Sequence, residues 1–410
     1  MDIARPQGIG AFPLPAGLLL IGPGPGHDEV RSALVAGQTP SQWPDSLRGH
    51  DAAFRGDTEA AIATFTGQDA VSAFNRYVLD PDGIDAAQVR QQLPDDLAVL
   101  VDLVDYMLGR ADHPPTSLRV RDDVAALVIS AQASAALEEQ QVERAMELLD
   151  GAAAACPPEA VPLQALLRGQ CAILRAENGG DVGAAVIELE TVLRLLEETD
   201  LNPARAELHQ RLGALLHESA ADGGMLQPAV AHYSAAVALV DEESAPEVWA
   251  MAHLGLGTAY LMMPMTQASD ALRSAVAISS LRSARRVFDP ISAPSPWSSA
   301  TLNLANALVY SPSRKQGDNL TEAVDLYEEV LALRDRDTDP LGRARVLTNQ
   351  GNALAHLGVF DHAKAKLAEA RFIFEEHLDH DSVMTVRSIL DEIARAGVPD
   401  EDGAAAGEAS

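Results

Sequence analysis

The sequence predicts an all-α fold, a solenoid in which antiparallel helix pairs stack one after another. One observation is a recurring spacing of small residues: a Gly or Ala, an Ala about 12 residues later, a large residue four further on and another small residue three beyond. A second is that Pro246, Pro294 and Pro340 each stand 11 residues before the first small residue of a unit. A proline there ends one helix and opens the next, so two unrelated markers indicate the same repeat.

The chain of 410 residues is strongly acidic, with 30 Lys and Arg against 60 Asp and Glu and a formal net charge of −30. Such a charge repels phosphate backbones and anionic lipid, so neither nucleic acid nor a membrane surface is expected as a partner. The 47% hydrophobic content is enough for a large core. Cys156 and Cys171 lack a C-x-x-C spacing and are expected to be small core residues.

Residues 1–45 are rich in proline and glycine and are expected to be irregular. Their apolar run covers only Leu18 to Ile21, with Arg5 as the sole basic residue before it, which does not fit a signal peptide. In GPGPG, residues 22–26, prolines remove amide donors and no Lys-Ser/Thr follows, so a stiff surface segment is expected rather than a phosphate loop. With no predicted membrane span, a cytoplasmic location is expected.

Residues 46–120 are expected to form a helical region with one repeat-like unit. That unit has the small-residue spacing at Gly49, Ala61 and Phe65. The segments FNRYVLD and DDLAVLVDLVDYMLG also indicate helices, but they lack the spacing. They are therefore either degenerate repeats or a helical cap.

Residues 121–396 are expected to form an array of about six helix pairs, followed by a disordered acidic tail at 397–410. Two units keep the spacing without gaps, and their positions are Ala133, Ala145, Leu149 and Ala152, and Gly351, Ala363, Leu367 and Ala370. Four others change the turn length and are aligned on Cys171, Ala185, Leu189 and Val192; Gly213, Ala229, Tyr233 and Ala236; Gly257, Ala268, Leu272 and Ala275; and Ala305, Ala323, Tyr327 and Val330. A long irregular linker, VFDPISAPSP, is expected before the fifth pair.

Small residues are needed because two antiparallel helices approach closely only where one side chain is Gly or Ala. A larger neighbour such as Leu354 or Leu367 then enters the gap. Each pair keeps a second apolar face, which the next pair buries, so several pairs are needed for a stable array.

The segments TNQGNAL, LGTAY and EAVDLYEEVLAL, with these offsets, resemble tetratricopeptide repeats over residues 125–396. The P-x-x-W opening and the inserted turn SRKQGDNL resemble the long-repeat variety common in bacteria. The resemblance implies a right-handed superhelix whose first helices line a concave groove for peptides or protein surfaces. It implies neither catalysis nor a cofactor.

The resemblance also places a set of side chains at groove-facing positions: Arg211, Asn303, Asn306, Tyr310, Arg345, Asn349, Asn352 and His356. An asparagine amide both donates to and accepts from an extended backbone, and an arginine binds a carboxylate through two bonds. The other interpretation is that the asparagines bond between neighbouring helices. Lysines are missing at the positions of the family's clamp for a terminal carboxylate.

Other clusters have alternative interpretations. His377, His380 and Asp381, near His356 and His362, have metal-like spacing but also suit a solvated helix end, and no metal site is predicted. Arg282, Arg285 and Arg286 either receive an acidic segment or favour a helix C-terminus. Met262, Met263 and Met265 either fill the core or contact a variable apolar ligand.

The predicted function is a scaffold or adaptor that binds a partner protein or extended peptide in the groove and assists assembly or regulation of a complex. No enzyme activity is expected, because no H-E-x-x-H, G-x-S-x-G, Walker-type or dinucleotide motif occurs. The alternative is a ligand-responsive sensor, in which the N-terminal region closes on the groove when a peptide or small molecule binds. A scaffold binds without a small molecule, whereas a sensor shows a ligand-dependent change in compactness or melting.

Overall fold

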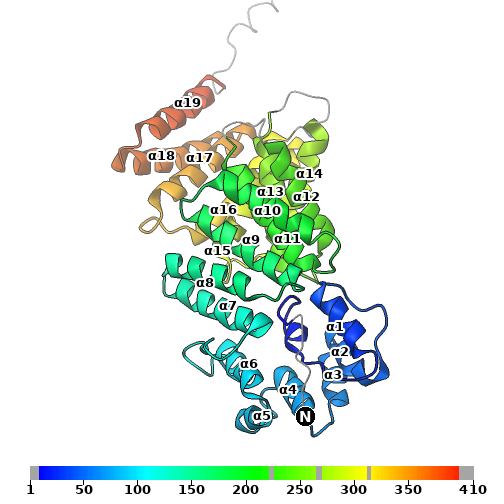
Figure 1. Ribbon diagram of the computed structural model, residues 1–410. Coiled ribbons are helices and arrows are strands. Elements are labelled where there is room, and N and C mark those ends of the chain that lie inside the picture. The colour runs from blue at the N-terminus through cyan, green and yellow to red at the C-terminus, as the bar shows by residue number, and fades with distance from the viewer. Residues whose placement is uncertain (1–8, 221–225, 265–269, 312–314, 397–410) are drawn as a thin grey trace, which may run out of the picture. The chain divides into compact units, whose positions relative to one another are not determined.

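The computed structural model describes residues 9–220, 226–264, 270–311 and 315–396 (Figure 1). All regular structure within these ranges is helical, so the all-α solenoid prediction is confirmed. The chain divides into two compact units, residues 1–219 and 220–410. The expected acidic tail lies outside the described residues.

Unit 1 starts with short helices and continues with longer ones. The short elements are η1 (Ala16–Leu18), α1 (His27–Val35), η2 (Asp45–Leu47), α2 (Arg48–Phe54), α3 (Thr58–Thr64), α4 (Ala70–Leu79) and α5 (Ala86–Gln92). The longer ones are α6 (Asp95–Met107), α7 (Asp122–Glu138), α8 (Val142–Ala155), α9 (Val161–Glu177), α10 (Val182–Leu195) and α11 (Asn202–Glu218).

The segment 1–45 was expected to be irregular, but it contains helix α1 and a buried apolar run at Leu18–Ile21. Leu20 is fully buried, and both of its backbone groups are bonded to a side chain of α4. Its N–H donates to Asn75 Oδ1 over 2.7 Å, and its carbonyl accepts from Asn75 Nδ2 over 2.8 Å. His50 Nε2 lies 2.9 Å from the same carbonyl. These contacts form a polar clasp, defined by Leu20, His50 and Asn75. The clasp supplies backbone hydrogen bonds to a buried segment that is not part of a helix.

The boundary between the compact units follows Ser219, inside the predicted array, rather than residue 120. The reason is a shared core, because Phe12, Val30 and Leu34 belong to the same buried cluster as residues of α7 to α11. The Asp200 N–H also donates to the Gly37 carbonyl over 2.8 Å. The N-terminal segment therefore packs on the first helix pairs.

Helices α2 and α3 form the predicted short repeat-like pair. A Cβ atom placed on Gly49 would lie 2.9 Å from Phe65 Cζ, so the close approach requires glycine. Ala61 is buried at the same contact. Each of the two helices is only seven residues long.

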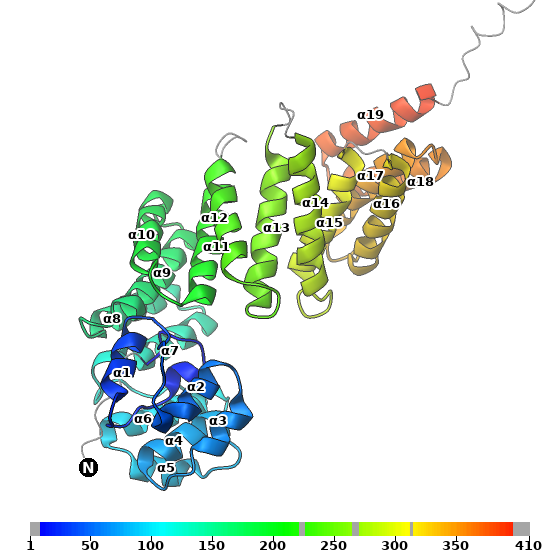
Figure 2. The same ribbon diagram turned by 90° about the vertical axis from the view of Figure 1, so that its right-hand side faces the viewer.

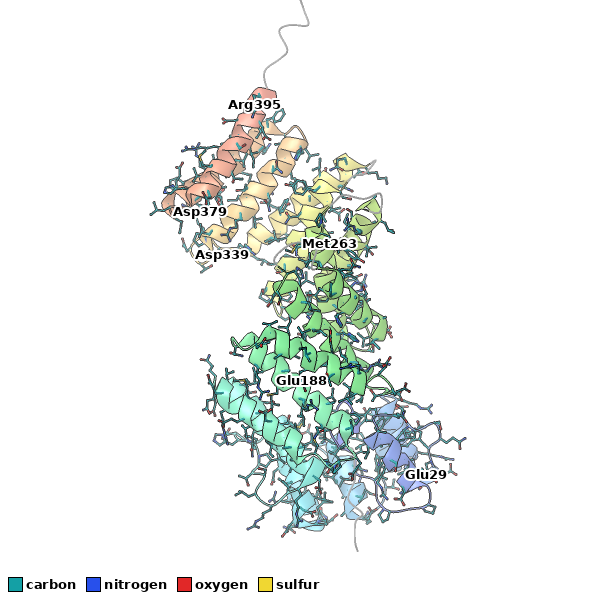
Figure 3. The ribbon with its side chains drawn as sticks, turned by 45° about the horizontal axis from the view of Figure 1, so that its top comes forward. Glu29, Glu188, Met263, Asp339, Asp379 and Arg395 are labelled. Atoms are coloured by element: carbon teal, nitrogen blue, oxygen red, sulfur yellow. The ribbon has the colours of Figure 1, made fainter. Side chains whose placement is uncertain are left out.

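Unit 2 consists of longer helices, and α13 to α16 lie side by side in Figure 2. Three of them, α13, α15 and α17, begin at the prolines that mark the repeat. Figure 3 shows Asp339 at the start of α17 and Asp379 at the start of α19. Each carboxylate accepts a hydrogen bond from a backbone N–H in the first turn of its helix. The helices are α12 (Leu226–Leu239), α13 (Pro246–Met262), α14 (Asp270–Val287), α15 (Pro294–Tyr310), α16 (Gln316–Leu333), α17 (Pro340–His356), α18 (Phe360–Glu376) and α19 (His380–Ala396).

The small residues lie where the two helices of a pair approach each other. A Cβ atom on Gly351 would be 2.7 Å from Leu367 Cγ, and Leu367 is fully buried. Ala363 and Ala370 are also fully buried, as their spacing predicts.

The pair α13/α14 corrects the sequence alignment. Gly257 was aligned with Leu272, but Leu272 is 68% exposed. A Cβ atom on Gly257 would instead meet Leu281 Cγ at 2.6 Å, and Ala277 and Ala284 occupy the small positions. Apolar residues recur every three or four positions along α14, so two alignments fit the pattern almost equally well.

The linker before α15 is shorter than predicted. Helix α14 continues to Val287 and α15 begins at Pro294, which leaves six residues between them. Phe288, the first of these residues, is buried in the core of unit 2. The proline and serine content of this connection predicted an irregular linker, but burial of the Phe288 ring holds it against the core.

Candidate partner-binding face

The first helices of successive pairs in unit 2 are joined by an amide ladder, which comprises Thr258, Asn303, Asn306, Tyr310, Asn349 and Asn352. On α15, Asn303 Nδ2 donates to Thr258 Oγ1 of α13 over 2.9 Å. On α17, Asn349 Nδ2 donates to Asn306 Oδ1 over 3.2 Å, and Asn352 Nδ2 donates to the Tyr310 hydroxyl over 3.2 Å. The structure thus shows the bonds between neighbouring helices that were one of the two interpretations of these asparagines.

Asn306 lies at the centre of the ladder. Its Oδ1 also accepts a hydrogen bond from the Tyr327 hydroxyl over 2.6 Å. This bond links α15 to α16, the second helix of the same pair. Tyr327 is almost fully buried, and this burial raises its pKa. The hydroxyl therefore remains a donor at physiological pH and fixes the Asn306 side chain.

The ladder is bordered by exposed side chains. Tyr310 is 68% exposed and Met262 is 57% exposed, so the core-filling interpretation is wrong for Met262. Arg345 and His356 on α17 are exposed as well. Unit 2 therefore carries seven of the eight predicted site residues on its first helices.

Arg211 belongs to unit 1, on α11. Its Nη1 lies 3.3 Å from Glu177 Oε1 of α9, and this ion pair borders a hollow of about 260 Å³. Residues of α7, such as Ser134 and Leu137, line the other side. The hollow is lined mainly by the first helices α7, α9 and α11 of neighbouring pairs.

The basic group on α14 is paired within unit 2. Arg282 lies 2.7 Å from a carboxylate oxygen of Glu322, Arg285 pairs with Glu329 and Arg286 pairs with Glu242. The guanidinium groups of Arg285 and Arg286 also lie over the rings of Trp297 and Trp249. These arginines connect α14 to α16 and to the segment that follows α12, so each already has an acidic partner within unit 2.

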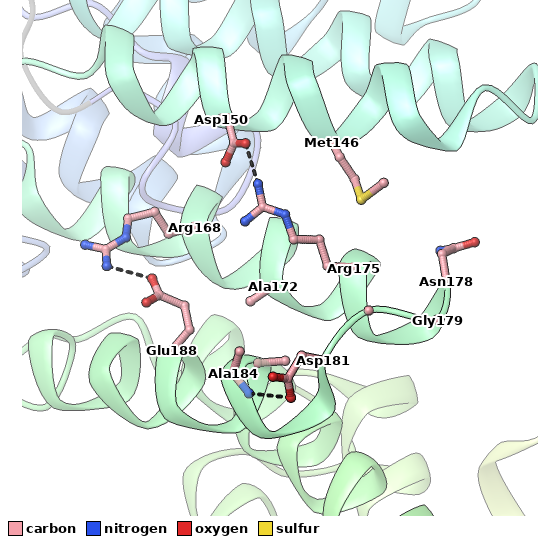
Figure 4. A pocket seen from close by; sticks show the side chains of 12 residues that line it. Met146, Asp150, Arg168, Ala172, Arg175, Asn178, Gly179, Asp181, Ala184 and Glu188 are labelled. Atoms are coloured by element: carbon pink, nitrogen blue, oxygen red, sulfur yellow. Dashed lines mark hydrogen bonds and ion pairs between the residues drawn. The ribbon is translucent and has the colours of Figure 1, made fainter.

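A further pocket of about 700 Å³ lies among α8, α9 and α10 (Figure 4). Two ion pairs cross it, Arg168 with Glu188 over 2.7 Å and Arg175 with Asp150. Each charge in these pairs has a partner, and the remaining charged side chain of the wall, Asp181, caps α10 by accepting from the Ala184 N–H.

The cysteines and histidines have structural roles. Cys156 and Cys171 are unpaired and buried, as expected, and burial raises the pKa of each thiol to about 11. His377 Nδ1 lies 2.9 Å from the Ile373 carbonyl. Within the described ranges, no group of three or more His, Cys, Asp or Glu side chains could hold a metal ion.

Comparison with solved structures gives matches at low sequence identity. The TPR domain of P58(IPK) is 14% identical, with 85% of this chain and 96% of that chain covered and a TM-score of 0.23. The APC/C hetero-tetramer Cut9-Hcn1 is also 14% identical, with 86% and 92% covered and a TM-score of 0.21. No family model and no curated protein matches this chain. None of the described helices is long and apolar enough to cross a membrane.

Another pocket that the sequence analysis did not predict has a volume of about 1060 Å³ and lies in the N-terminal part of unit 1. Its wall includes His27, Ser46, His50, Phe65 and Asp69. These residues follow no known motif and come from separate short elements. Only the two histidines near the apolar run at 18–21 gave a signal, since a histidine beside a buried segment requires hydrogen-bond partners.

Proposed function

We propose that this protein is a scaffold whose α13, α15 and α17 face binds an extended segment of a partner protein. The observation that supports the proposal is the amide ladder, because it presents hydrogen-bonding groups at the same positions of successive helices. An extended backbone presents N–H and C=O groups at regular intervals, and side-chain amides pair with both.

Each ladder asparagine uses only part of its bonding capacity within the fold. Among the described residues, the oxygens of Asn303, Asn349 and Asn352 accept no hydrogen bond, and the amide nitrogen of Asn306 donates none. All four side chains are half-buried rather than enclosed. The bonds between helices hold the amides in fixed orientations, which lowers the entropy lost when a partner binds.

The exposed residues beside the ladder supply contacts of other kinds. Tyr310 offers an aromatic surface and a hydroxyl, which is a common combination at binding hot spots. Met262 offers an adaptable apolar side chain. Arg345 adds a positive charge at the α17 end, so a partner segment with a carboxylate there is favoured.

Selection from a displayed library of random unstructured peptides tests the proposal. The full chain is used as bait, and the affinity of selected peptides is then measured by fluorescence anisotropy. We expect Tyr310→Ala to weaken binding at least about tenfold, as expected for a hot-spot aromatic residue. Phe372→Ala is the matched control, because Phe372 is a half-exposed aromatic residue on the second helix α18.

Equal weakening by Tyr310→Ala and Phe372→Ala, at equal melting temperatures, would place binding elsewhere. Failure to enrich any peptide would remove the support for an extended ligand. The sensor alternative predicts that peptides bind only after a small molecule is added. It stays a prediction, as does the absence of enzyme activity.

A further inference from the structure

The pocket in the N-terminal part of unit 1 has a floor of buried polar groups. His50 is 3% exposed and lines the pocket together with the edge-on ring of Phe65, whose centroid is 5.1 Å from that of His50. The volume of about 1060 Å³ lies at the upper end of the range for small-molecule sites. This pocket is separate from the amide ladder, which lies in unit 2.

His50 presents an acceptor atom without a donor. A carbonyl oxygen can only accept, so His50 Nε2, 2.9 Å from the Leu20 carbonyl, carries the ring proton in the neutral imidazole. His50 Nδ1 is then an acceptor, and it has no hydrogen-bond partner among the described residues. This nitrogen is enclosed by its neighbours, so it is not itself a contact atom for a ligand.

The hydroxyl groups of the wall also act as acceptors, because their protons are already used. His27 Nδ1 lies 2.7 Å from the Gly22 carbonyl and must donate, so the Ser46 hydroxyl donates to His27 Nε2, also over 2.7 Å. The Thr64 hydroxyl donates to the Ala61 carbonyl over 2.7 Å. The Ser72 hydroxyl donates to Asp69 Oδ2 over 2.7 Å. Each oxygen keeps lone pairs for a ligand.

The charge of the wall is negative. Partial burial raises the pKa of Asp69, but hydrogen bonds from the Ser72 hydroxyl and amide outweigh this and leave the pKa below its ordinary value. Asp69 is therefore a carboxylate at neutral pH. Burial lowers the pKa of His50 to about 4, so its ring is neutral there. None of the residues that line the pocket is Lys or Arg.

We infer that this pocket binds a small organic cation with N–H donors, an amine or a guanidinium compound. Donors on the ligand pair with Ser46 Oγ, Ser72 Oγ and the Asp69 carboxylate, and the ring of Phe65 offers an aromatic surface to the cation. Gln68 and Gln92, whose amides both donate and accept, lie on the wall as well and pair with either kind of group. A small anion meets acceptors and a carboxylate, and it is excluded.

Calorimetric titration of the full chain with agmatine, which carries both an amine and a guanidinium group, tests this inference. Glutarate and 1,4-butanediol serve as the anionic and neutral probes. The titrations are made at about 0.15 M salt, where surface charges more than about 8 Å apart are screened. This condition limits non-specific attraction of agmatine to a chain with a net charge of −30.

The key variant is Asp69→Asn, which keeps an N-cap side chain on α4 but removes the charge. The matched control is Asp85→Asn, because Asp85 caps α5 in the same unit, does not line the pocket and gives the same change in net charge. We expect saturable agmatine binding that Asp69→Asn weakens at least about tenfold, as for a charge-assisted hydrogen bond, and that Asp85→Asn leaves unchanged.

Ser46→Ala is expected to weaken agmatine less than Asp69→Asn does, because it removes one neutral acceptor. Three results would overturn the inference: no saturable binding of agmatine or of arginine amide, equal binding of agmatine and 1,4-butanediol, or equal weakening by Asp69→Asn and Asp85→Asn. The last result would assign the binding to general surface charge. Circular dichroism melting of each variant confirms that the comparison is made between folded chains.

Discussion

The N-terminal part of unit 1 and the helix pairs of unit 2 are stabilised in different ways. In unit 2, glycines such as Gly351 and Gly257 let a leucine of the paired helix enter the gap, and the contact is apolar. In the N-terminal part, the chain around Leu20 is held by the buried side chains of Asn75 and His50. The helix pairs thus depend mainly on fit between side chains, whereas the N-terminal part adds a few buried hydrogen bonds to its apolar contacts.

This difference affects how each region responds to substitution. A close apolar contact tolerates small changes, because neighbouring side chains shift and the penalty rises gradually. A buried polar clasp has no such tolerance, because loss of one partner leaves the other unpaired in an apolar surrounding. We therefore expect the largest effects of single substitutions in the N-terminal part.

The largest effect is predicted for Asn75→Ala. The substitution leaves the Leu20 N–H unpaired and removes one of two donors to its carbonyl, so we expect a loss of about 4 kcal/mol in the free energy of unfolding. Urea unfolding followed by circular dichroism measures it. Asn178→Ala is the control, because Asn178 bonds Leu174 at an exposed helix end, and it should cost less than about 1 kcal/mol. Similar losses of stability in both variants would show that the buried clasp contributes no more than an exposed hydrogen bond.

A second prediction concerns pH. Burial lowers the pKa of His50 to about 4, more than the bond to Leu20 raises it, and the electrostatic interaction with His27 lowers it further. In the unfolded chain the His50 ring binds a proton near pH 6.5. The stability that the neutral, buried ring contributes to the folded chain is therefore fully present above pH 6.5 and is lost as the pH falls toward 4. The loss amounts to about 3 kcal/mol.

Hydrogen exchange of the α2 amides, corrected for the intrinsic rate at each pH, measures this loss locally. The intact chain should open more readily at pH 5 than at pH 7.5. His50→Gln, which has no titrating ring, should show a weaker dependence over the same range. If both chains respond equally, other groups cause the change.

In unit 2, Gly351→Ala tests the close contact with Leu367. The added Cβ would lie 2.7 Å from Leu367 Cγ, and Leu367 is fully buried, so we expect a loss of about 2 kcal/mol despite the higher helix propensity of alanine. Gly317→Ala is the control, because no side chain or neighbouring element among the described residues lies within 4 Å of the added Cβ at that helical position. It should raise stability by about 0.5 kcal/mol. A lower melting temperature for Gly351→Ala and a higher one for Gly317→Ala would separate the effect of the close contact from that of helix propensity.

The same difference explains what could be predicted from the sequence. The helix pairs depend on residues three or four positions apart, so the spacing around Gly351 indicated them correctly. The α13/α14 alignment was wrong because periodic apolar residues allow more than one register. The clasp joins Leu20 to Asn75, which are 55 residues apart in the sequence, and no local pattern records such a contact. The asparagines of the ladder could be located from the repeat, but their bonding partners could not.

The smallest effect is predicted for the ion pairs between second helices. Arg282 Nη2 lies 2.8 Å and 2.7 Å from the two carboxylate oxygens of Glu322, but both side chains are about half exposed. Water and salt screen such a pair, so a double-mutant cycle with Arg282→Gln and Glu322→Gln should give a coupling of about 0.5 kcal/mol. The coupling should fall when the salt concentration is raised.

A coupling above about 2 kcal/mol, comparable with the cost of Gly351→Ala, would contradict the view that unit 2 is stabilised mainly by apolar fit. Unit 2 would then depend on charged pairs between successive helices as much as on apolar fit within pairs. The expected small value instead assigns most of its stability to the small-residue contacts. The cycle isolates the pair because glutamine keeps the length of glutamate and leaves the neighbouring pair of Arg285 with Glu329 in place.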